Sequence, residues 1–241
     1  MKAIEIKDLT KVFGDITAVS HLSLSVEEGE LFALLGVNGA GKTTTIKMLT
    51  GLLKPTSGNA EIYGHSVVSD MKNVKPLLDV SMQETSIARK LTVRENIDFY
   101  ASLNGVPKDE LKKVEGDVIS AFGLQSVKDK RADKLSGGYK RKLSVALALV
   151  KKPKILFLDE PTLGMDVIAR RELWKTITEL KKNTTIVLTT HYMEEAESLA
   201  DRIGIMKGGE LLFVGTKDEL YAATGKTSVE ESFLQIVTGE N

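Results

Sequence analysis

The sequence has no cysteine, which removes disulfide bonds and thiolate metal ligands as means of holding the fold together. It also has no excess of charge, because 33 basic residues are balanced by 33 acidic ones. Bulk charge therefore does not draw the chain to nucleic acid or to an anionic membrane, and we expect no nucleic-acid partner. Neither internal repeats nor a low-complexity linker divides the sequence.

Long apolar runs are absent as well. The longest, such as LSVALALV at residues 143–150, fall far short of the roughly 20 residues that cross a bilayer. The first residues, MKAIEIKDL, are charged and contain no apolar signal-peptide segment. With 42% hydrophobic residues in a chain of 241, a substantial core can form. We therefore expect a soluble, cytoplasmic chain that acts on a membrane only through a partner.

What is present alternates between strand and helix patterns. Thr92 and Glu95 have the spacing of a helical capping box, and Gly208 with Gly209 marks a hairpin turn. We expect strands within residues 3–35, 60–82, 154–160, 184–190 and 203–215, and helices after the glycine loop at 36–44 and within 92–150, 168–182 and 192–201.

This alternation favours an α/β fold with a mostly parallel sheet, an antiparallel β subdomain and an inserted helical subdomain. We expect a single domain over residues 1–241. Its α/β core with the β subdomain would comprise residues 1–83 and 151–214, the helical subdomain residues 84–150, and a short helical tail residues 215–241.

A glycine-rich loop after the apolar run LFALL carries the clearest chemical signal. Gly36, Gly41, Lys42 and Thr43 match G-x-x-x-x-G-K-[ST] between an apolar strand and a helix, the context that this motif requires. Backbone N–H groups of such a loop surround phosphate oxygens, Lys42 neutralises the outer phosphates, and the Thr43 hydroxyl is placed for Mg²⁺. We therefore expect a P-loop NTPase (RecA-like) core that binds a nucleoside triphosphate through Gly36, Val37, Asn38, Gly39, Ala40, Gly41, Lys42, Thr43 and Thr44.

The segment KILFLDEP supplies the acidic partner that a P-loop needs. Its apolar residues predict a buried strand that ends in Asp159 and Glu160. Asp159 is expected to hold Mg²⁺, while Glu160 polarises the attacking water. Together with the P-loop, this pair predicts hydrolysis of the bound nucleotide.

A second stretch suited to an anion lies at residues 135–150, LSGGYKRKLSVALALV. Small residues ahead of a helix N-terminus, followed by Lys140, Arg141 and Lys142, favour a phosphate there. Ser136 can cap this helix, whose apolar face is formed by Tyr139, Leu143, Ala146, Leu147 and Val150. The residues alone therefore predict two phosphate-binding helix ends in one chain.

In their order along the chain, GVNGAGKTT, LSGGYKRKLSVALAL, ILFLDEPT, LGMD and the histidine after TTIVLTT resemble the ATP-binding cassette (ABC) of ABC transporters. The resemblance covers roughly residues 2–214, and the LSGG stretch separates it from P-loop kinases and GTPases. It implies that Phe13 stacks on adenine and that Gln83 reaches Mg²⁺ and the attacking water. It also implies that His191 contacts the γ-phosphate and that Asp166 lies in a loop that crosses between subunits.

The same resemblance implies that two cassettes associate head to tail. Ser136, Gly137 and Gly138 of one copy would then close on the ATP held by the P-loop of the other. Tyr139 stands where the family often has glutamine, which leaves its contribution to closure open. The implied partners are a second copy or a similar cassette, together with integral membrane permease subunits. They would hold the chain on the inner face of the cell membrane.

Several stretches, including LTVRENIDFYASLNGV and RRELWKTI, are most similar to cassettes of bacterial exporters for drugs, sodium ions or lipids. We therefore interpret the chain as the ATP-binding and ATP-hydrolysing subunit of an exporter, driven by ATP-dependent dimerisation. An importer cassette, or a non-transport cassette acting on ribosomes or DNA, is the alternative interpretation.

Overall fold

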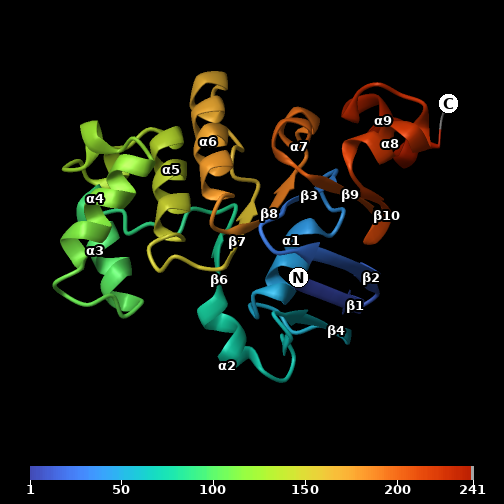
Figure 1. The fold of residues 1–241 in the computed structure, drawn as a ribbon, viewed down its shortest axis with the longest axis horizontal. Helices are drawn as coiled ribbons and strands as arrows, with labels where there is room; N and C mark the ends of the chain where they lie inside the picture. The colour runs from blue at the N-terminus through green and yellow to red at the C-terminus, as the bar shows by residue number, and fades with distance from the viewer. Residues whose placement is uncertain (240–241) are drawn as a thin grey trace.

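Two β-sheets form the centre of the molecule in the computed structural model, which describes residues 1–239 (Figure 1). The larger sheet has the strand order β10-β9-β3-β8-β7-β6. Its central strands run parallel to one another, and β10 pairs antiparallel with β9 at one edge. Its strands are β3 (Leu31–Gly36), β6 (Leu78–Ser81), β7 (Ile155–Asp159), β8 (Thr185–Thr190), β9 (Arg202–Lys207) and β10 (Glu210–Gly215). The expected mostly parallel sheet is thus confirmed.

The second sheet is antiparallel and has the order β2-β1-β4-β5. Its long strands come from the alternating stretch near the start of the sequence. These are β1 (Lys2–Phe13) and β2 (Ile16–Glu27), and two shorter strands, β4 (Ser57–Ile62) and β5 (His65–Ser66), follow later in the chain. This sheet is the expected antiparallel part of the fold.

The helices cover the larger sheet on one side and fill the space between the sheets on the other. They are α1 (Lys42–Leu49), α2 (Met71–Val74), α3 (Val93–Leu103), α4 (Leu111–Ala121), α5 (Gly137–Leu147), α6 (Val167–Leu180), α7 (Met193–Leu199), α8 (Lys217–Thr224) and α9 (Val229–Thr238). Short 3₁₀ turns lie at Lys75–Leu77, Gln125–Val127 and Ala132–Lys134. In Figure 1, α3, α4 and α5 lie together at one end of the molecule, beyond β6.

Alternation along the buried strands sorts their side chains into two cores. Leu31, Ala33 and Leu35 of β3 point into the core that the helices α3 to α7 cover, whereas Phe32 and Leu34 point toward α1 and the antiparallel sheet. Because successive side chains of a strand face opposite sides, a strand with both faces covered is apolar at every position. The continuous run LFALL therefore marks a central strand, and the loop that follows it starts at the carboxyl edge of the sheet.

The start of the helical block agrees with its predicted cap. The Thr92 hydroxyl accepts a hydrogen bond from the Glu95 N–H at 3.3 Å, and the Glu95 carboxylate accepts one from the Thr92 N–H at 2.7 Å. The stretch 60–82 differs from its expectation, because it contains the short helix α2 in addition to strands. The predicted tail contains α8 and α9, and its last two residues, 240 and 241, lie outside the described residues.

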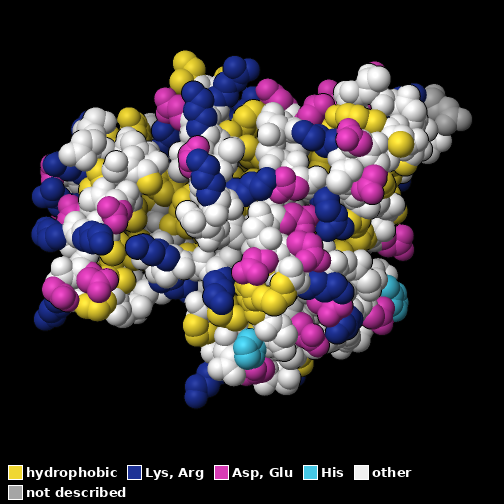
Figure 2. All heavy atoms as spheres, viewed as in Figure 1, with side chains coloured by type: hydrophobic (Ala, Val, Ile, Leu, Met, Phe, Trp, Pro, Cys, Tyr) yellow, Lys and Arg dark blue, Asp and Glu magenta, His cyan; other side chains and the backbone are white. Residues whose placement is uncertain are grey.

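Charges of both signs are interspersed over the face seen in Figure 2, in keeping with the balanced composition. Within residues 1–239, a helix with the length and apolarity needed to cross a membrane is absent.

The core between the sheets depends on Phe157, which is 0% exposed on β7. Phe157→Ala should lower the free energy of unfolding by about 3–5 kcal/mol, because the smaller side chain leaves a cavity in close-packed surroundings. Urea unfolding followed by far-UV circular dichroism measures the change. Leu103→Ala, at a position that is 70% exposed, is the matched control and should stay within about 0.5 kcal/mol of the parent. Equal effects of the two substitutions would contradict this packing.

Candidate functional site

The loop between β3 and α1 has a conformation that glycine makes accessible. Gly39 and Gly41 have φ of 82° and 105°, in the region that residues with a Cβ rarely adopt. At Gly36, an added Cβ would lie 2.6 Å from the carbonyl oxygen of Met206. The glycines of the motif therefore serve both a sharp backbone turn and a close approach to β9. The turn ends where α1 begins at Lys42, so the N–H groups of that helix end face the loop.

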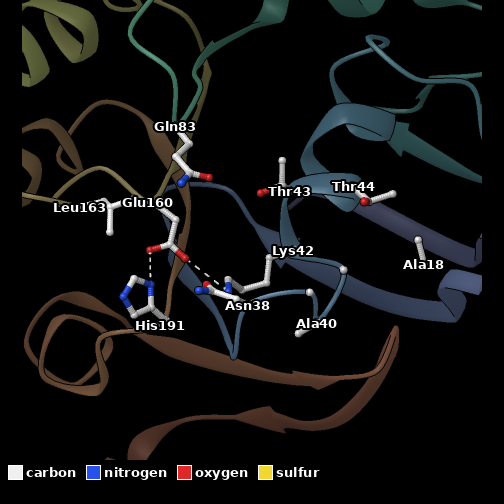
Figure 3. A pocket seen from close by; sticks show the side chains of 12 residues that line it. Ala18, Asn38, Ala40, Lys42, Thr43, Thr44, Gln83, Glu160, Leu163 and His191 are labelled. Carbon is white, nitrogen blue, oxygen red and sulfur yellow. Dashed lines mark hydrogen bonds and ion pairs between the residues drawn. The ribbon is translucent and has the colours of Figure 1, made fainter.

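A cavity of about 490 Å³ opens over this loop. Figure 3 shows that the loop and helix α1 form one side of it, with Gln83, Glu160 and His191 opposite. Its lining consists of Ala18, Asn38, Gly39, Ala40, Gly41, Lys42, Thr43, Thr44, Gln83, Glu160, Leu163 and His191. The structure thus gathers the P-loop and the residues expected to act on the γ-phosphate around one space. Asp159 does not line the cavity, but Thr43, which does, donates a hydrogen bond to its carboxylate.

Lys42 is folded back over the loop. Its ammonium donates hydrogen bonds to the carbonyl oxygens of Gly36 at 2.6 Å and Val37 at 3.2 Å, and lies 3.3 Å from a carboxylate oxygen of Glu160. The side chain is only 6% exposed, so these acceptors compensate for the loss of water around its charge. An ammonium fixed in this way at a glycine loop is placed to bind an anionic ligand.

Asp159 joins three elements next to the cavity. The Thr43 hydroxyl of α1 donates to its carboxylate at 3.0 Å, and the Thr189 hydroxyl of β8 donates to it at 2.6 Å. The carboxylate itself is 0% exposed at the end of β7. Thr189 was missed by sequence reasoning, although its place in TTIVLTT at the end of a buried strand beside β7 could have indicated it.

Glu160 and His191 form a directly bonded pair. The His191 Nδ1 atom lies 2.8 Å from a Glu160 carboxylate oxygen, and the Glu160 side chain is 7% exposed. Glu160 has φ of 50°, in the left-handed region, and its N–H donates to the main-chain oxygen and the hydroxyl of Thr189 at 3.1 Å each. This turn directs Glu160 into the cavity, although Asp159, its neighbour in sequence, faces α1.

The donor set of this cavity fits Mg²⁺. This ion prefers oxygen ligands, keeps several waters, and is typically held by one or two carboxylates together with substrate phosphates. The Thr43 hydroxyl and the Asp159 carboxylate lie at the end of the P-loop and already share a hydrogen bond. The exposed Gln83 side chain reaches the same space from the opposite side (Figure 3). These residues match the expected metal ligands, whose role stays a prediction.

Phe13 lies apart from this assembly. It ends β1 next to the turn into β2, is 47% exposed, and its ring centre is 5.0 Å from the Lys11 ammonium. It is not among the residues that line the cavity, whereas Ala18 of the following strand is. Stacking of Phe13 on adenine therefore stays a prediction.

The second predicted phosphate site does not reach the cavity of its own chain. Ser136 and Gly137 are exposed at the start of α5, and the Ser136 hydroxyl accepts the Tyr139 N–H at 3.4 Å, which confirms the predicted cap. A Cβ added to Gly138 would lie 3.5 Å from the side chain of Ala169 on α6. Asp166 caps that helix by accepting the Ala169 N–H at 2.9 Å. Both helix ends therefore lie on a surface beside the site rather than inside it.

The basic residues of α5 are not all available to an anion, contrary to the prediction. Arg141 is 4% exposed and donates to main-chain carbonyls of neighbouring segments, while the Lys142 ammonium lies 2.6 Å from the Glu172 carboxylate. The helix is buried on most of its circumference, and not only on the predicted face, because α3, α6 and β6 contact it. A pattern of local charges could not indicate these partners.

Glu195 of α7 is a further buried acid that sequence reasoning missed. Its carboxylate accepts hydrogen bonds from the Thr162 hydroxyl at 3.0 Å and from the Trp174 indole N–H at 2.9 Å. The residue is 0% exposed, and burial raises the pKa of its carboxyl above the ordinary value of 4.5, whereas the hydrogen bonds from Trp174 and Thr162 act in the opposite direction. Glu195 thereby ties the helix after His191 to the segment after Glu160.

The free energy of unfolding of Glu195→Gln, measured relative to that of the wild type, should increase as the pH rises. Since the folded pKa is raised, the unfolded chain releases the Glu195 proton first, so the wild type loses stability from about pH 4.5 up to the folded pKa. Glutamine can accept the same hydrogen bonds and does not titrate. The difference in free energy of unfolding should therefore grow by at most about 1.4 kcal/mol per pH unit and then level off.

Urea unfolding of the two proteins at about pH 5 and pH 7.5, followed by circular dichroism, measures this difference. Glu194→Gln is the matched control, because Glu194 is exposed on the same helix, and its effect should stay within about 0.5 kcal/mol at both pH values. A Glu195→Gln effect that is the same at both pH values would contradict the raised pKa.

Comparison with known proteins agrees with this geometry. A family model described as ABC transporter matches residues 19–163. The chain is 40% identical over 240 residues to the "Probable multidrug ABC transporter ATP-binding protein YbhF" of Escherichia coli (strain K12), covering 97% of this chain and 41% of that protein. It is 45% identical over 217 residues to the human "Phospholipid-transporting ATPase ABCA3", covering 88% of this chain and 13% of that protein. The chain thus spans less than half of these relatives.

Among solved structures, the chain is similar to one described as "Structure of ATP binding subunit of ABC transporter". The TM-score is 0.87 at 27% identity, and the match covers 97% of this chain and 99% of the other. The family model, the relatives and the fold all agree with a cavity over a P-loop that has the neighbouring acids Asp159 and Glu160. The chain belongs to the ABC transporter family.

Proposed function

We propose that the chain drives an ABC exporter by binding and hydrolysing ATP in a site that is completed by a second copy or a similar cassette. The observation that carries this proposal is the cavity in which Glu160 contacts both Lys42 and His191, next to the hydrogen bond between Thr43 and Asp159. This arrangement offers a cation for the phosphates, a carboxylate for the attacking water and an imidazole for the γ-phosphate.

Each side chain has a definite task in this proposal. Lys42 binds the β- and γ-phosphates together with the N–H groups of the loop. Glu160 orients the attacking water and accepts its proton at the carboxylate. With His191 Nδ1 engaged by Glu160 at 2.8 Å, Nε2 is the nitrogen that contacts the γ-phosphate.

The metal ligands complete the same site. Thr43, Asp159 and Gln83 would hold Mg²⁺, which supplies neutralisation of the phosphate charge when it is bound. Gln83 also lies on the segment that leads from β6 to the helices within residues 84–150. Through this segment, binding or hydrolysis of the nucleotide would be transmitted to a membrane subunit. Phe13 would contact the adenine from the β1–β2 turn.

The exposed start of α5 supports a composite site. The first N–H groups of a helix have no partner within it, and together with the dipole they bind anions. Ser136, Gly137 and Gly138 present this helix end away from the cavity of their own chain. A second cassette arranged head to tail would bring its nucleotide to this end, with the Asp166 loops between the two copies. ATP would then close the pair, and hydrolysis would open it.

The kind of transport is inferred from relatives. The names of the E. coli and human relatives mention a multidrug transporter and a phospholipid-transporting ATPase, and both are substantially longer than this chain. We therefore propose an exporter, with integral permease subunits or domains that hold the cassette at the inner face of the cell membrane. Residues 84–150, together with Gln83, would form the groove that receives a cytoplasmic helix of the permease.

Lys42→Ala should weaken binding of ATP by about 10- to 100-fold, because a charge-assisted hydrogen bond to phosphate contributes about 1.5–3 kcal/mol. Isothermal titration calorimetry with Mg²⁺ and a non-hydrolysable ATP analogue measures the affinity. Lys47→Ala is the matched control, since Lys47 is exposed at the far end of the same helix, and it should bind as the wild type does. Unchanged affinity of the Lys42 variant would remove the P-loop assignment.

Glu160→Gln should slow hydrolysis by about 10²- to 10⁴-fold, because it removes the proton acceptor while keeping the shape of the side chain. ATP should then hold the variant as a dimer, which light scattering after size-exclusion chromatography detects. Adding Ser136→Arg should abolish the dimer and leave the ATP affinity of the single chain nearly unchanged. A strictly monomeric Glu160→Gln variant at saturating ATP would contradict the composite site.

A further inference from the structure

Arg141 uses its entire guanidinium to bind main-chain oxygens of two separate segments. Nε donates to the carbonyl of Pro161, and Nη2 donates to those of Asp159 and Glu160. Nη1 donates to the carbonyls of Met82 and Gln83. These hydrogen bonds are 2.5 to 2.9 Å long. One side chain of α5 therefore joins the segment after β6 to the segment after β7.

The choice of acceptors is informative. Arg141 is 4% exposed, and such a buried cation would ordinarily be paired with a carboxylate. Here carbonyl oxygens of Asp159 and Glu160 accept its protons, so the carboxylates of these residues remain bonded to Thr43 and His191. Burial lowers the pKa of Arg141 to about 10, and nearby Asp159, Glu160 and Glu195 oppose this shift, so the group is charged at neutral pH.

These hydrogen bonds fix the conformation of the main chain at Glu160. Its φ of 50° lies in the left-handed region, which costs a residue with a Cβ roughly 1–2 kcal/mol. Thr189 accepts the Glu160 N–H on one side of the residue, and Arg141 donates to the Glu160 carbonyl on the other. The strained turn that directs the carboxylate into the cavity is thus fixed at both of its peptide groups.

The same helix is also fastened to β6. Ser144, one turn beyond Arg141 on α5, shares a hydrogen bond of 3.1 Å with Ser81 at the end of that strand. Arg141 and Ser144 therefore bind α5 along the stretch from Ser81 to Gln83. Lysine could not replace the guanidinium, because a single ammonium has three donors and lacks the planar fork that spans both segments.

We propose that Arg141 is a positioning residue for ATP hydrolysis. It fixes Gln83 and Glu160 relative to each other and to α5, the helix that follows the LSGG stretch and is called the signature helix below. The proposal rests on the proposed roles of Glu160 and Gln83 in the reaction. It adds that the geometry of these two residues is set from α5, the helix whose first residues contact the nucleotide of the other cassette. Movement of α5 on closure is therefore passed to both residues.

The kinetic test compares Arg141→Lys with Arg171→Lys, the same substitution at an exposed arginine of α6. Arg141→Lys should lower kcat by about 10²-fold, since a displacement of about 1 Å in a reacting group has an effect of this size. KM for ATP should change by no more than about twofold, because Lys42 and the loop are untouched. Arg171→Lys should match the wild type in both constants. A wild-type kcat for Arg141→Lys, or a fall in which KM rises in proportion, would overturn the proposal.

A structural readout separates this proposal from the proposed function. Amide hydrogen exchange of the nucleotide-free chain should be at least about tenfold faster at Glu160, whose N–H donates to Thr189, in Arg141→Lys, with Arg171→Lys unchanged. If Glu160→Gln hydrolyses ATP at the wild-type rate, the proposed function fails, whereas this exchange result is unaffected. Unchanged exchange of the Glu160 amide would overturn the role of Arg141.

A measurement on the unmodified chain covers the case in which the variants do not fold. The Nη protons of Arg141 should give separate, slowly exchanging resonances in ¹⁵N-edited spectra at neutral pH, because their carbonyl acceptors block rotation of the guanidinium. Exposed Arg171 should give averaged signals. Averaged signals from Arg141 as well would overturn the proposal.

Discussion

The buried carboxylate of Asp159 is the interaction on which the rest of the site depends. It is withdrawn from water and accepts hydrogen bonds from Thr43 and Thr189, which lie on α1 and β8. A carboxylate buried without such donors would cost several kcal/mol. The fold therefore has to bring the start of α1 and the ends of two parallel strands to one point. That point lies next to Thr43, which lines the cavity over the P-loop.

Two acids in sequence serve different purposes because the chain turns between them. Asp159 still belongs to β7 and faces α1, whereas Glu160 has left the strand with a positive φ and faces Lys42 and His191. The strain of this turn is offset by hydrogen bonds at both of its peptide groups: the Glu160 N–H donates to Thr189, and Arg141 donates to the Glu160 carbonyl. Separate hydrogen bonds for the main chain and the side chain allow the turn to be rigid while the carboxylate remains available for chemistry.

Patterns that are local in sequence predicted much of this molecule. The apolar runs at 31–35 and 155–158 indicated strands covered on both faces, and the glycine loop and the DE pair indicated the two halves of one cavity. The burial of Arg141 could not be predicted, because its acceptors lie on segments distant in sequence and are main-chain atoms that no side-chain pattern reveals. Glu195 was missed for a related reason, since EEAES reads as the polar face of a surface helix until Trp174 and Thr162 cover it.

The signature helix shows why a site can be divided between two chains without becoming loose. The middle of α5 is buried and bonded to the segments that carry Gln83 and Glu160, while its first residues are exposed. A helix held along its length transmits a displacement of its end with little loss, because its packed surroundings resist deformation. If a second cassette docks its nucleotide on Ser136 and Gly137, the displacement reaches Gln83 and Glu160 through one guanidinium. The positions of Gln83 and Glu160 in each site would then depend on whether the opposite site holds a nucleotide. Such coupling would restrict ATP hydrolysis to the closed pair.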